Sequence, residues 1–261
     1  MTNALLGAAL AACVSFAALR ARALTRDGAV AAFVVGAAVF GATGWRGALV
    51  LFAFFVPSAL LSRLGRARKA ALGAVGKHGP RDAWQVIANG GAAALCALLA
   101  MRGSAVFAAA FAGAFAAAAG DTWGTEIGTL SQNPPRSILT FRQVEPGLSG
   151  GVTLVGTLAT LAGAAVVACV AALAGIASFF PVAVGGFAGA LIDSLLGATV
   201  QAQRWCNDCA RPCETNPHRC GAPTTLRRGV AWLDNDAING AATLSGAVIA
   251  AALTAFLTRG S

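Results

Sequence analysis

The chain has 261 residues, of which 57% are hydrophobic and 11% are charged, and its mean hydropathy is +0.71. Soluble domains carry about 25% charged residues, so this composition excludes an ordinary soluble domain and indicates a polytopic membrane protein. The net charge of +9 fits the positive-inside topology of such proteins, and we expect no nucleic-acid partner.

Eight apolar segments predict an all-α transmembrane bundle of about eight spans, within a single integral membrane domain of residues 1–261. In chain order they are Ala4–Leu19, Gly28–Gly44, Gly47–Leu61, Ala83–Met101, Ser104–Gly120, Val152–Gly175, Phe179–Val200 and Ile238–Leu257. Several are shorter than the roughly 20 residues that cross a bilayer comfortably. The second and third segments are separated by Trp45 and Arg46 alone, which predicts a tight helical hairpin.

The basic residues divide unequally between the two sides that eight spans define. Arg46, Arg102 and Arg259 lie on one side, and the other lysines and arginines lie on the opposite side. The positive-inside rule makes the basic side cytoplasmic, with both termini outside, and we expect a multi-pass plasma-membrane protein. The acids other than Asp193 lie in loops or span ends on this side, which favours an active face at the cytosol over an ion-conducting path.

The stretch GDTWGTEIG places two acids where the fifth apolar segment ends. Asp121 and Glu126 flank Thr122 and Thr125. A carboxylate at such a position is costly and marks a functional site. Carboxylates with hydroxyl groups between them suit Mg²⁺, which takes one or two carboxylates plus substrate phosphates. The alternative is a capped helix end with solvated acids.

The glycine-rich turn PGLSGG follows, with Ser149, Gly150 and Gly151 at the start of the next apolar segment. Backbone amides at the start of a helix bind phosphate, and glycine allows close approach. Arg136 and Arg142 lie nearby and are predicted to clamp phosphates. Simpler explanations exist for both features, because interhelical turns need glycine and cytoplasmic arginines set topology.

Polar residues also occur within or next to two other apolar segments. Asp193 and Ser194 lie inside the seventh segment. Asp193 is about 12 Å along a helix from Gln201, the residue that follows the segment. An isolated carboxylate there needs a metal, a proton or a charged partner. An internal salt bridge or a protonated acid is the alternative to a functional role. Asn89 lies in the fourth segment, where a helix–helix hydrogen bond is an adequate explanation.

The entry to the last segment, WLDNDAING, holds Asp234, Asn235, Asp236 and Asn239. Residues three or four apart share a helix face, so these side chains can converge. Helix capping requires one such residue, and this stretch has four. We therefore predict a second group that binds metal or orients phosphate, with Asp234 and Asp236 as further Mg²⁺ ligands.

Four of the seven cysteines lie in a predicted cytoplasmic loop at 201–237. Cys206 and Cys209 form a C-x₂-C pair, and His218 and Cys220 form H-x-C, which together supply four tetrahedral ligands for a structural Zn²⁺. Such an ion would stabilise a loop too short to have its own core. The alternative is a group of reduced cytosolic thiols.

These motifs together resemble a family of integral membrane proteins that includes plant phytyl-phosphate kinase and animal transmembrane protein 19. The matching pieces are LTRDGAVAAFVVG, QVIANGG, GDTWGTEIG, PGLSGGVTLVGTLATLAG, LIDSLLGATVQ, the C-x₂-C and H-x-C-G pairs and WLDNDAIN, in order along nearly the whole chain. The resemblance implies conversion of phytyl phosphate to phytyl diphosphate with a nucleoside triphosphate. The chain is also similar to membrane enzymes that use CTP on lipid alcohols and lipid phosphates. The cysteine loop occurs in part of the family, which argues against catalysis there, and Cys213 is left outside the ligand set.

The predicted function is therefore a membrane-embedded kinase for an isoprenoid monophosphate, phytyl or polyprenyl, with CTP the favoured donor. The predicted catalytic and Mg²⁺-binding carboxylates are Asp121, Glu126, Asp193 and Asp236. The predicted contacts to substrate and nucleotide are Thr122, Thr125, Asn89, Arg136, Arg142, Ser149, Gly150, Gly151, Ser194, Gln201, Asn235 and Asn239. Two alternatives stay open: a CTP-dependent nucleotidyltransferase that makes a CDP-lipid, and an ion-coupled transporter or lipid flippase.

Overall fold

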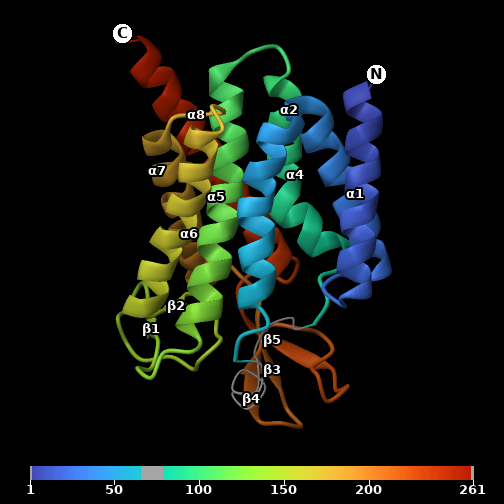
Figure 1. Ribbon diagram of the computed structural model, residues 1–261. Coiled ribbons are helices and arrows are strands. Elements are labelled where there is room, and N and C mark those ends of the chain that lie inside the picture. The colour runs from blue at the N-terminus through green and yellow to red at the C-terminus, as the bar shows by residue number, and fades with distance from the viewer. Residues whose placement is uncertain (1, 66–78, 260–261) are drawn as a thin grey trace.

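A computed structural model describes residues 2–65 and 79–259, and this part of the chain is mostly helical (Figure 1). Its helices are α1 (Thr2–Arg20), α2 (Arg26–Leu61), α4 (Ala83–Ala100), α5 (Ala105–Gly128), α6 (Leu154–Leu173), α7 (Phe179–Thr199) and α8 (Asn235–Arg259). Among the described residues, six helices are long and apolar enough to cross a membrane, and Leu5–Arg20 of α1 is a shorter apolar helix. A polytopic helical bundle is thus confirmed, whereas the count of eight spans stays a prediction.

Helix α2 is folded back on itself at Gly44. This residue has φ 65° and ψ −156°, a backbone conformation that glycine adopts readily and other residues avoid. A straight helix of 36 residues would be about 54 Å long. Instead its two ends lie close together. Arg63 Nη2, just beyond α2, donates to Ala21 O, a few residues before α2, at 3.1 Å. The two arms run in opposite directions (Figure 1), as the predicted hairpin requires.

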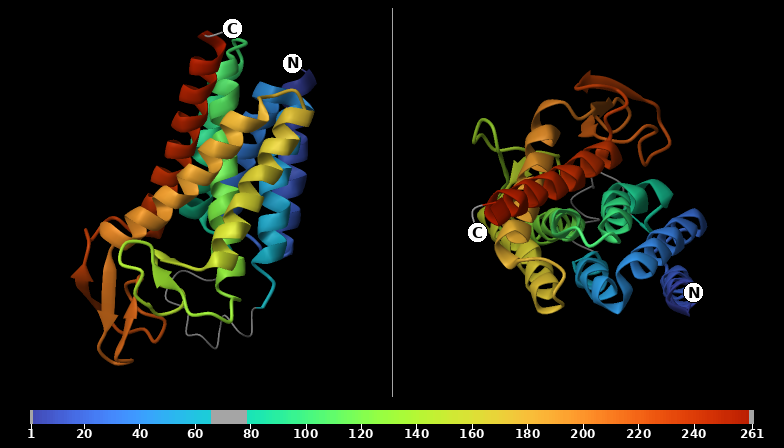
Figure 2. Two further views of the ribbon diagram at one scale, coloured as in Figure 1. Left: turned by 90° about the vertical axis from the view of Figure 1, so that its left-hand side faces the viewer. Right: turned by 90° about the horizontal axis from the view of Figure 1, so that it is seen from above.

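Helix α5 lies at the centre of the bundle, surrounded by α2, α4, α6, α7 and α8 (Figure 2). Every residue from Ala109 to Gly120 is buried. Alanine and glycine predominate in this run, so the neighbouring helices approach closely. A Cβ added at Gly113 would lie 2.6 Å from Gly246 O of α8. Such close packing fixes the polar end of α5 relative to α8.

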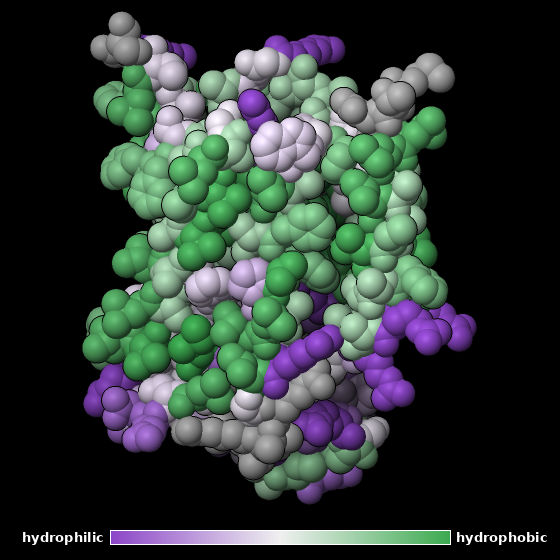
Figure 3. All heavy atoms as spheres, viewed as in Figure 1, coloured by the Kyte–Doolittle hydropathy of each residue, from purple (hydrophilic) through white to green (hydrophobic). Residues whose placement is uncertain are grey.

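The two ends of the bundle differ in their connections. Both ends of the described chain lie at the same end of the bundle, and the two small sheets lie at the opposite end, which we call the sheet end (Figure 1). Hydrophobic side chains cover the middle of the face in Figure 3, and hydrophilic ones gather toward the sheet end. Basic residues counted toward the predicted cytoplasmic side include several outside the described residues: Arg66, Arg68, Lys69 and Lys77.

The all-α prediction needs correction at the sheet end. Strand β1 (Arg136–Ser137) pairs antiparallel with β2 (Gly151–Val152). A second antiparallel sheet has the order β4 (Arg211–Cys213), β3 (Gln203–Cys206) and β5 (Thr224–Arg228). Proline interrupts helices because it lacks an N–H and clashes with the preceding turn, and residues 201–237 contain Pro212, Pro217 and Pro223. The short segments of this loop therefore pair as strands.

Candidate functional site

Two carboxylates from different helices meet near the sheet end. Asp121 belongs to α5 and Asp193 to α7, and Asn239 of α8 lies between them. With its amide nitrogen facing the carboxylates, Asn239 Nδ2 lies 3.0 Å from Asp193 Oδ2 and 3.2 Å from Asp121 Oδ2. In the same orientation Asn235 Nδ2 donates to Asn239 Oδ1 at 2.9 Å. Residues from three separate sequence motifs thus form one hydrogen-bonded cluster.

Arg81 adds a positive charge beside this cluster. Burial lowers the pKa of the Arg81 guanidinium, and the negative charges of Glu126 and Asp121 oppose this shift. Arginine stays protonated at any physiological pH, so Arg81 is a fixed cation next to the two acids of GDTWGTEIG. In the sequence Arg81 is one of many basic residues on the predicted cytoplasmic side, and no motif there indicates its place at the site.

The segment before α2 holds the Arg81 backbone in place. Arg81 N donates to Ala23 O at 2.9 Å, and Arg81 O accepts from Thr25 N at 3.0 Å. A Cβ added at Gly28 would collide with Arg81 O, so glycine there permits the close approach. Asp27 Oδ2 accepts from Ala83 N at 3.1 Å. The LTRDG stretch, which had no predicted site role, therefore positions Arg81.

The acids that open α8 have two different environments. Asp236 is buried, whereas Asp234 is exposed and caps the helix. Asp234 Oδ1 accepts from Asp236 N at 3.1 Å and from Ala237 N at 3.0 Å. Both acids line a pocket of about 370 Å³ between the starts of α4 and α8, together with Trp84, Ile87, Ala88 and Ala237. Helix capping thus explains Asp234 by itself, while Asp236 shares the buried side of α8 with Asn239.

Glu214, which no sequence motif indicates, is a buried carboxylate in the loop after β4. Its Oε1 accepts from Ser149 N at 2.8 Å, and its Oε2 accepts from Ser149 Oγ at 2.9 Å and from Gln201 Nε2 at 3.0 Å. Burial raises the pKa of Glu214, and these hydrogen bonds oppose the shift. Its negative charge also acts on Asp193. The donors of Ser149 are therefore engaged by a carboxylate of the protein itself.

Packing accounts for the glycines of the PGLSGG turn. Gly150 has φ 80°, and a Cβ there would collide with Ala198 of α7, so glycine lets the turn lie directly on α7. A Cβ added at Gly151 would lie 2.9 Å from Val144 Cγ2 and 3.0 Å from Leu148 O. Phosphate binding by Ser149, Gly150 and Gly151 stays a prediction, with this packing as an independent reason for both glycines.

The remaining predicted residues lie in varied surroundings. Arg136 and Arg142 are exposed, and Arg136 Nη1 donates to Phe141 O within its own loop at 2.8 Å. Asn89 Nδ2 donates to Gln85 O of the same helix at 2.9 Å. Next to the clustered acids, Thr122 and Ser194 are half-buried, whereas Thr125 is exposed. The structure thus brings Asp121, Asp193, Asn235 and Asn239 together, whereas Arg136 and Arg142 lie exposed in their own loop.

An apolar cavity of about 160 Å³ lies among α1, α2 and α4, beside Phe115 of α5. Its lining follows α1 from Gly7 to Ala18, about 16 Å along the helix. Most of the other lining residues are hydrophobic, while Arg81, Gln85 and Asn89 line it toward the sheet end. Because Arg81 also interacts with Asp121 and Glu126, the cavity and the carboxylates share this cation.

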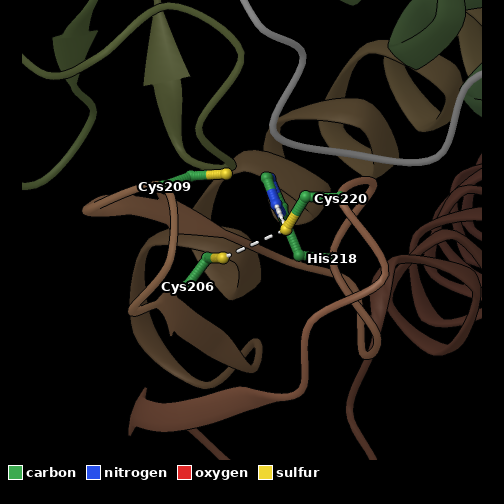
Figure 4. Close-up of side chains that lie close together, drawn as sticks. All are labelled: Cys206, Cys209, His218 and Cys220. Atoms are coloured by element: carbon green, nitrogen blue, oxygen red, sulfur yellow. Dashed lines mark hydrogen bonds between the residues drawn. The ribbon is translucent and has the colours of Figure 1, made fainter.

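The four predicted zinc ligands converge in the sheet-end loop (Figure 4). The ligand atoms of Cys206, Cys209, His218 and Cys220 all lie within 4.8 Å of one another. Cys206 Sγ lies 3.6 Å from Cys220 Sγ, and His218 Nδ1 lies 3.2 Å from Cys220 Sγ. The contact with His218 lowers the pKa of the Cys220 thiol to about 6. Cys213 is outside this group.

Comparison with known proteins gives a family and several relatives. Residues 9–247 match the family described as "Integral membrane protein DUF92". The chain is 30% identical to Protein PGR of Arabidopsis thaliana, over 94% of this chain and 91% of that protein. It is 32% identical to an uncharacterized membrane protein of Methanocaldococcus jannaschii, over 69% and 75% of the two chains.

A further relative is Protein VTE6, chloroplastic, of Arabidopsis thaliana, which is 28% identical over 90% of this chain and 66% of that protein. No solved structure matches the chain significantly. These relatives support an integral multi-pass membrane protein. They do not support the plasma membrane in particular, because one of them is named as chloroplastic.

Proposed function

The chain belongs to the DUF92 family of integral membrane proteins, and from this premise we propose that it is an isoprenoid-monophosphate kinase. An oxygen of the lipid phosphate attacks the γ-phosphorus of a nucleoside triphosphate, CTP being favoured. The new O–P bond forms as the bond to the β,γ-bridging oxygen breaks, giving a lipid diphosphate and a nucleoside diphosphate. One observation carries the proposal: Arg81 lines an apolar cavity and also lies beside Asp121 and Glu126.

In this proposal the apolar cavity binds the isoprenoid tail, and the polar groups at the sheet end bind the phosphates. The isoprenoid tail lies in the cavity among α1, α2 and α4, and Arg81 attracts its phosphate at the sheet end. The pocket beside Asp236 gives the nucleotide phosphates a separate approach. The lipid phosphate is already ionised at neutral pH, so no strong general base is needed. Positioning and charge neutralisation are the main requirements of this chemistry.

The donor set fits Mg²⁺. Carboxylate oxygens of Asp121 and Asp193 face the same Asn239 amide, and such hard oxygen ligands suit Mg²⁺ better than softer metals. Glu126, whose charge acts on Asp121 of the same helix, and Asp236, which lies with Asn239 on the buried side of α8, are the further proposed ligands. Bound there, Mg²⁺ would supply the positive charge that offsets the negative charge of the transferring phosphoryl group.

We also propose that the sheet end faces the cytosol, where nucleoside triphosphates are present. The excess of basic residues in the connections at this end supports that orientation. With α1 and the two arms of α2 each counted as a span, the chain crosses the membrane eight times and both termini lie outside. Membrane lipids then surround the hydrophobic belt of the bundle.

The test uses purified protein in detergent, with γ-labelled CTP or ATP and either phytyl or geranylgeranyl monophosphate, with and without Mg²⁺. We expect Mg²⁺-dependent transfer of label into a lipid diphosphate, with CTP as the better donor. Pyrophosphate release with formation of a CDP-lipid would identify a nucleotidyltransferase instead. Absence of nucleotide turnover with every lipid phosphate would contradict both enzymatic readings and leave the transporter or flippase.

Filling the cavity is expected to discriminate between isoprenoid chain lengths. Val14 lines the cavity on α1, and the adjacent Cys13 is exposed outside it. A larger side chain at Val14 takes up space that a long tail needs, so Val14→Phe should lower kcat/KM for geranylgeranyl monophosphate about tenfold. Geranyl monophosphate should be affected much less, and Cys13→Phe is the matched control. Equal losses for both lipids, or in both variants, would place the tail elsewhere.

A further inference from the structure

We propose that Cys206, Cys209, His218 and Cys220 bind a structural Zn²⁺ whose role is to hold Glu214 against the Ser149 turn, beside the carboxylate site. The proposed kinase activity does not require this ion. The inference rests on the geometry of the four ligands and on the position of Glu214 between the two ligand pairs in the chain.

The ligand atoms of the four side chains all lie within 4.8 Å of one another, close to the spacing of a tetrahedral site. In a tetrahedral zinc site the Zn–S bonds are about 2.3 Å and the Zn–N bonds about 2.0 Å long, so the ligand atoms lie roughly 3.5–3.8 Å apart. The Cys206–Cys220 sulfur separation is 3.6 Å, and the separation from His218 Nδ1 to Cys220 Sγ is 3.2 Å. The side chains point toward a shared space (Figure 4). Three sulfurs and one nitrogen complete the shell of a closed structural zinc site.

The sheet that carries these ligands has little apolar core of its own. Its buried hydrophobic cluster among the described residues consists of Cys206, Cys213 and Ala222. A domain this small is commonly stabilised by a metal or a disulfide. The sulfur separation of 3.6 Å between Cys206 and Cys220 is too long for a disulfide, whose S–S bond is about 2.0 Å. Metal binding is therefore the stabilisation that fits these residues.

Glu214 lies between the C-x₂-C pair and the H-x-C pair, so an ion joining the pairs fixes both sides of its segment. A buried carboxylate is costly unless its oxygens are hydrogen-bonded, and Glu214 obtains these bonds from Ser149 and Gln201. Gln201 lies two residues beyond the end of α7, which carries Asp193. Loss of the ion is therefore expected to release Glu214 and loosen the turn at Ser149.

The first experiment measures metal in the purified full-length protein. We expect about one zinc per chain in the wild type and in Cys213→Ser, and none in Cys209→Ser or Cys220→Ser. Cys213 is the matched control because it is buried in the same loop but lies outside the ligand group. Cobalt added to metal-stripped wild type should give the visible absorption of a tetrahedral thiolate site, a readout independent of variant folding. Zinc-free wild type without that cobalt spectrum would overturn the site.

The second experiment tests the coupling by amide hydrogen exchange, with no lipid or nucleotide present. Stripping zinc should accelerate exchange roughly tenfold at the Ser149 amide as well as in the 203–228 sheet, because the amide loses a buried acceptor. Glu214→Gln should loosen the Ser149 turn while keeping its zinc. A loosened sheet with an unchanged Ser149 amide would overturn the coupling. Either failure leaves the kinase proposal intact, because neither readout depends on turnover.

Discussion

Replacing Asp193 with asparagine is expected to lower lipid-phosphate phosphorylation by at least about 100-fold. Asp193 Oδ2 lies 3.0 Å from Asn239 Nδ2, and the same nitrogen lies 3.2 Å from Asp121 Oδ2. The substitution keeps the shape of the side chain but removes the negative charge. Cation binding at the cluster is therefore weakened. The measurement is label transfer from γ-labelled nucleotide to lipid phosphate over a range of Mg²⁺ concentrations.

Two observations would separate this effect from a loss of folding. Glu145→Gln removes an exposed carboxylate from the loop before the PGLSGG turn and should leave the rate unchanged. Asp193→Asn should elute as the same monodisperse species in detergent, with a raised Mg²⁺ requirement. An Asp193→Asn variant with the wild-type rate and Mg²⁺ dependence would remove Asp193 from the metal site.

The clustered acids could be predicted because their surroundings make them conspicuous. Asp121 follows a long apolar segment directly and Asp193 lies inside another, where an unpaired charge is costly. The i, i+4 spacing of Asn235 and Asn239 likewise indicates a shared helix face. What the sequence could not show is that α5, α7 and α8 bring these residues to one point. That depends on packing of alanine and glycine surfaces, which contain little directional information.

Arg81 and Glu214 are inconspicuous in the sequence for the opposite reason. Each lies in a polar connection, where a charged side chain needs no special explanation. Their partners are also distant in sequence: Thr25 lies 56 positions from Arg81, and Ser149 lies 65 positions from Glu214. The strands of the cysteine loop were missed because they are short and irregular. Contacts of this range become visible only in the folded chain.

Arg81 lines the apolar cavity and also interacts with the carboxylates of Asp121 and Glu126. We therefore expect its positive charge to control binding of the lipid phosphate. The backbone bonds of Arg81 to Ala23 and Thr25 do not involve its side chain. Arg81→Gln therefore keeps the backbone hydrogen bonds to the segment before α2 while removing the positive charge. Arg81→Lys restores the charge but not the planar, forked donor geometry that matches a phosphate.

For Arg81→Gln we expect kcat/KM for the lipid phosphate to fall about 100-fold, the size of effect seen when one partner of a buried charge pair is lost. The KM for the lipid phosphate should rise while the KM for the nucleotide stays near its wild-type value, because Arg81 lines the apolar cavity and is absent from the lining of the pocket beside Asp236. Arg81→Lys should recover part of the loss. Arg102→Gln, which removes an exposed arginine from the connection between α4 and α5, should behave like wild type. Equal rises in both KM values for Arg81→Gln would assign Arg81 to the shared metal and phosphate centre, and unchanged values for both would show that the lipid phosphate binds away from the cavity.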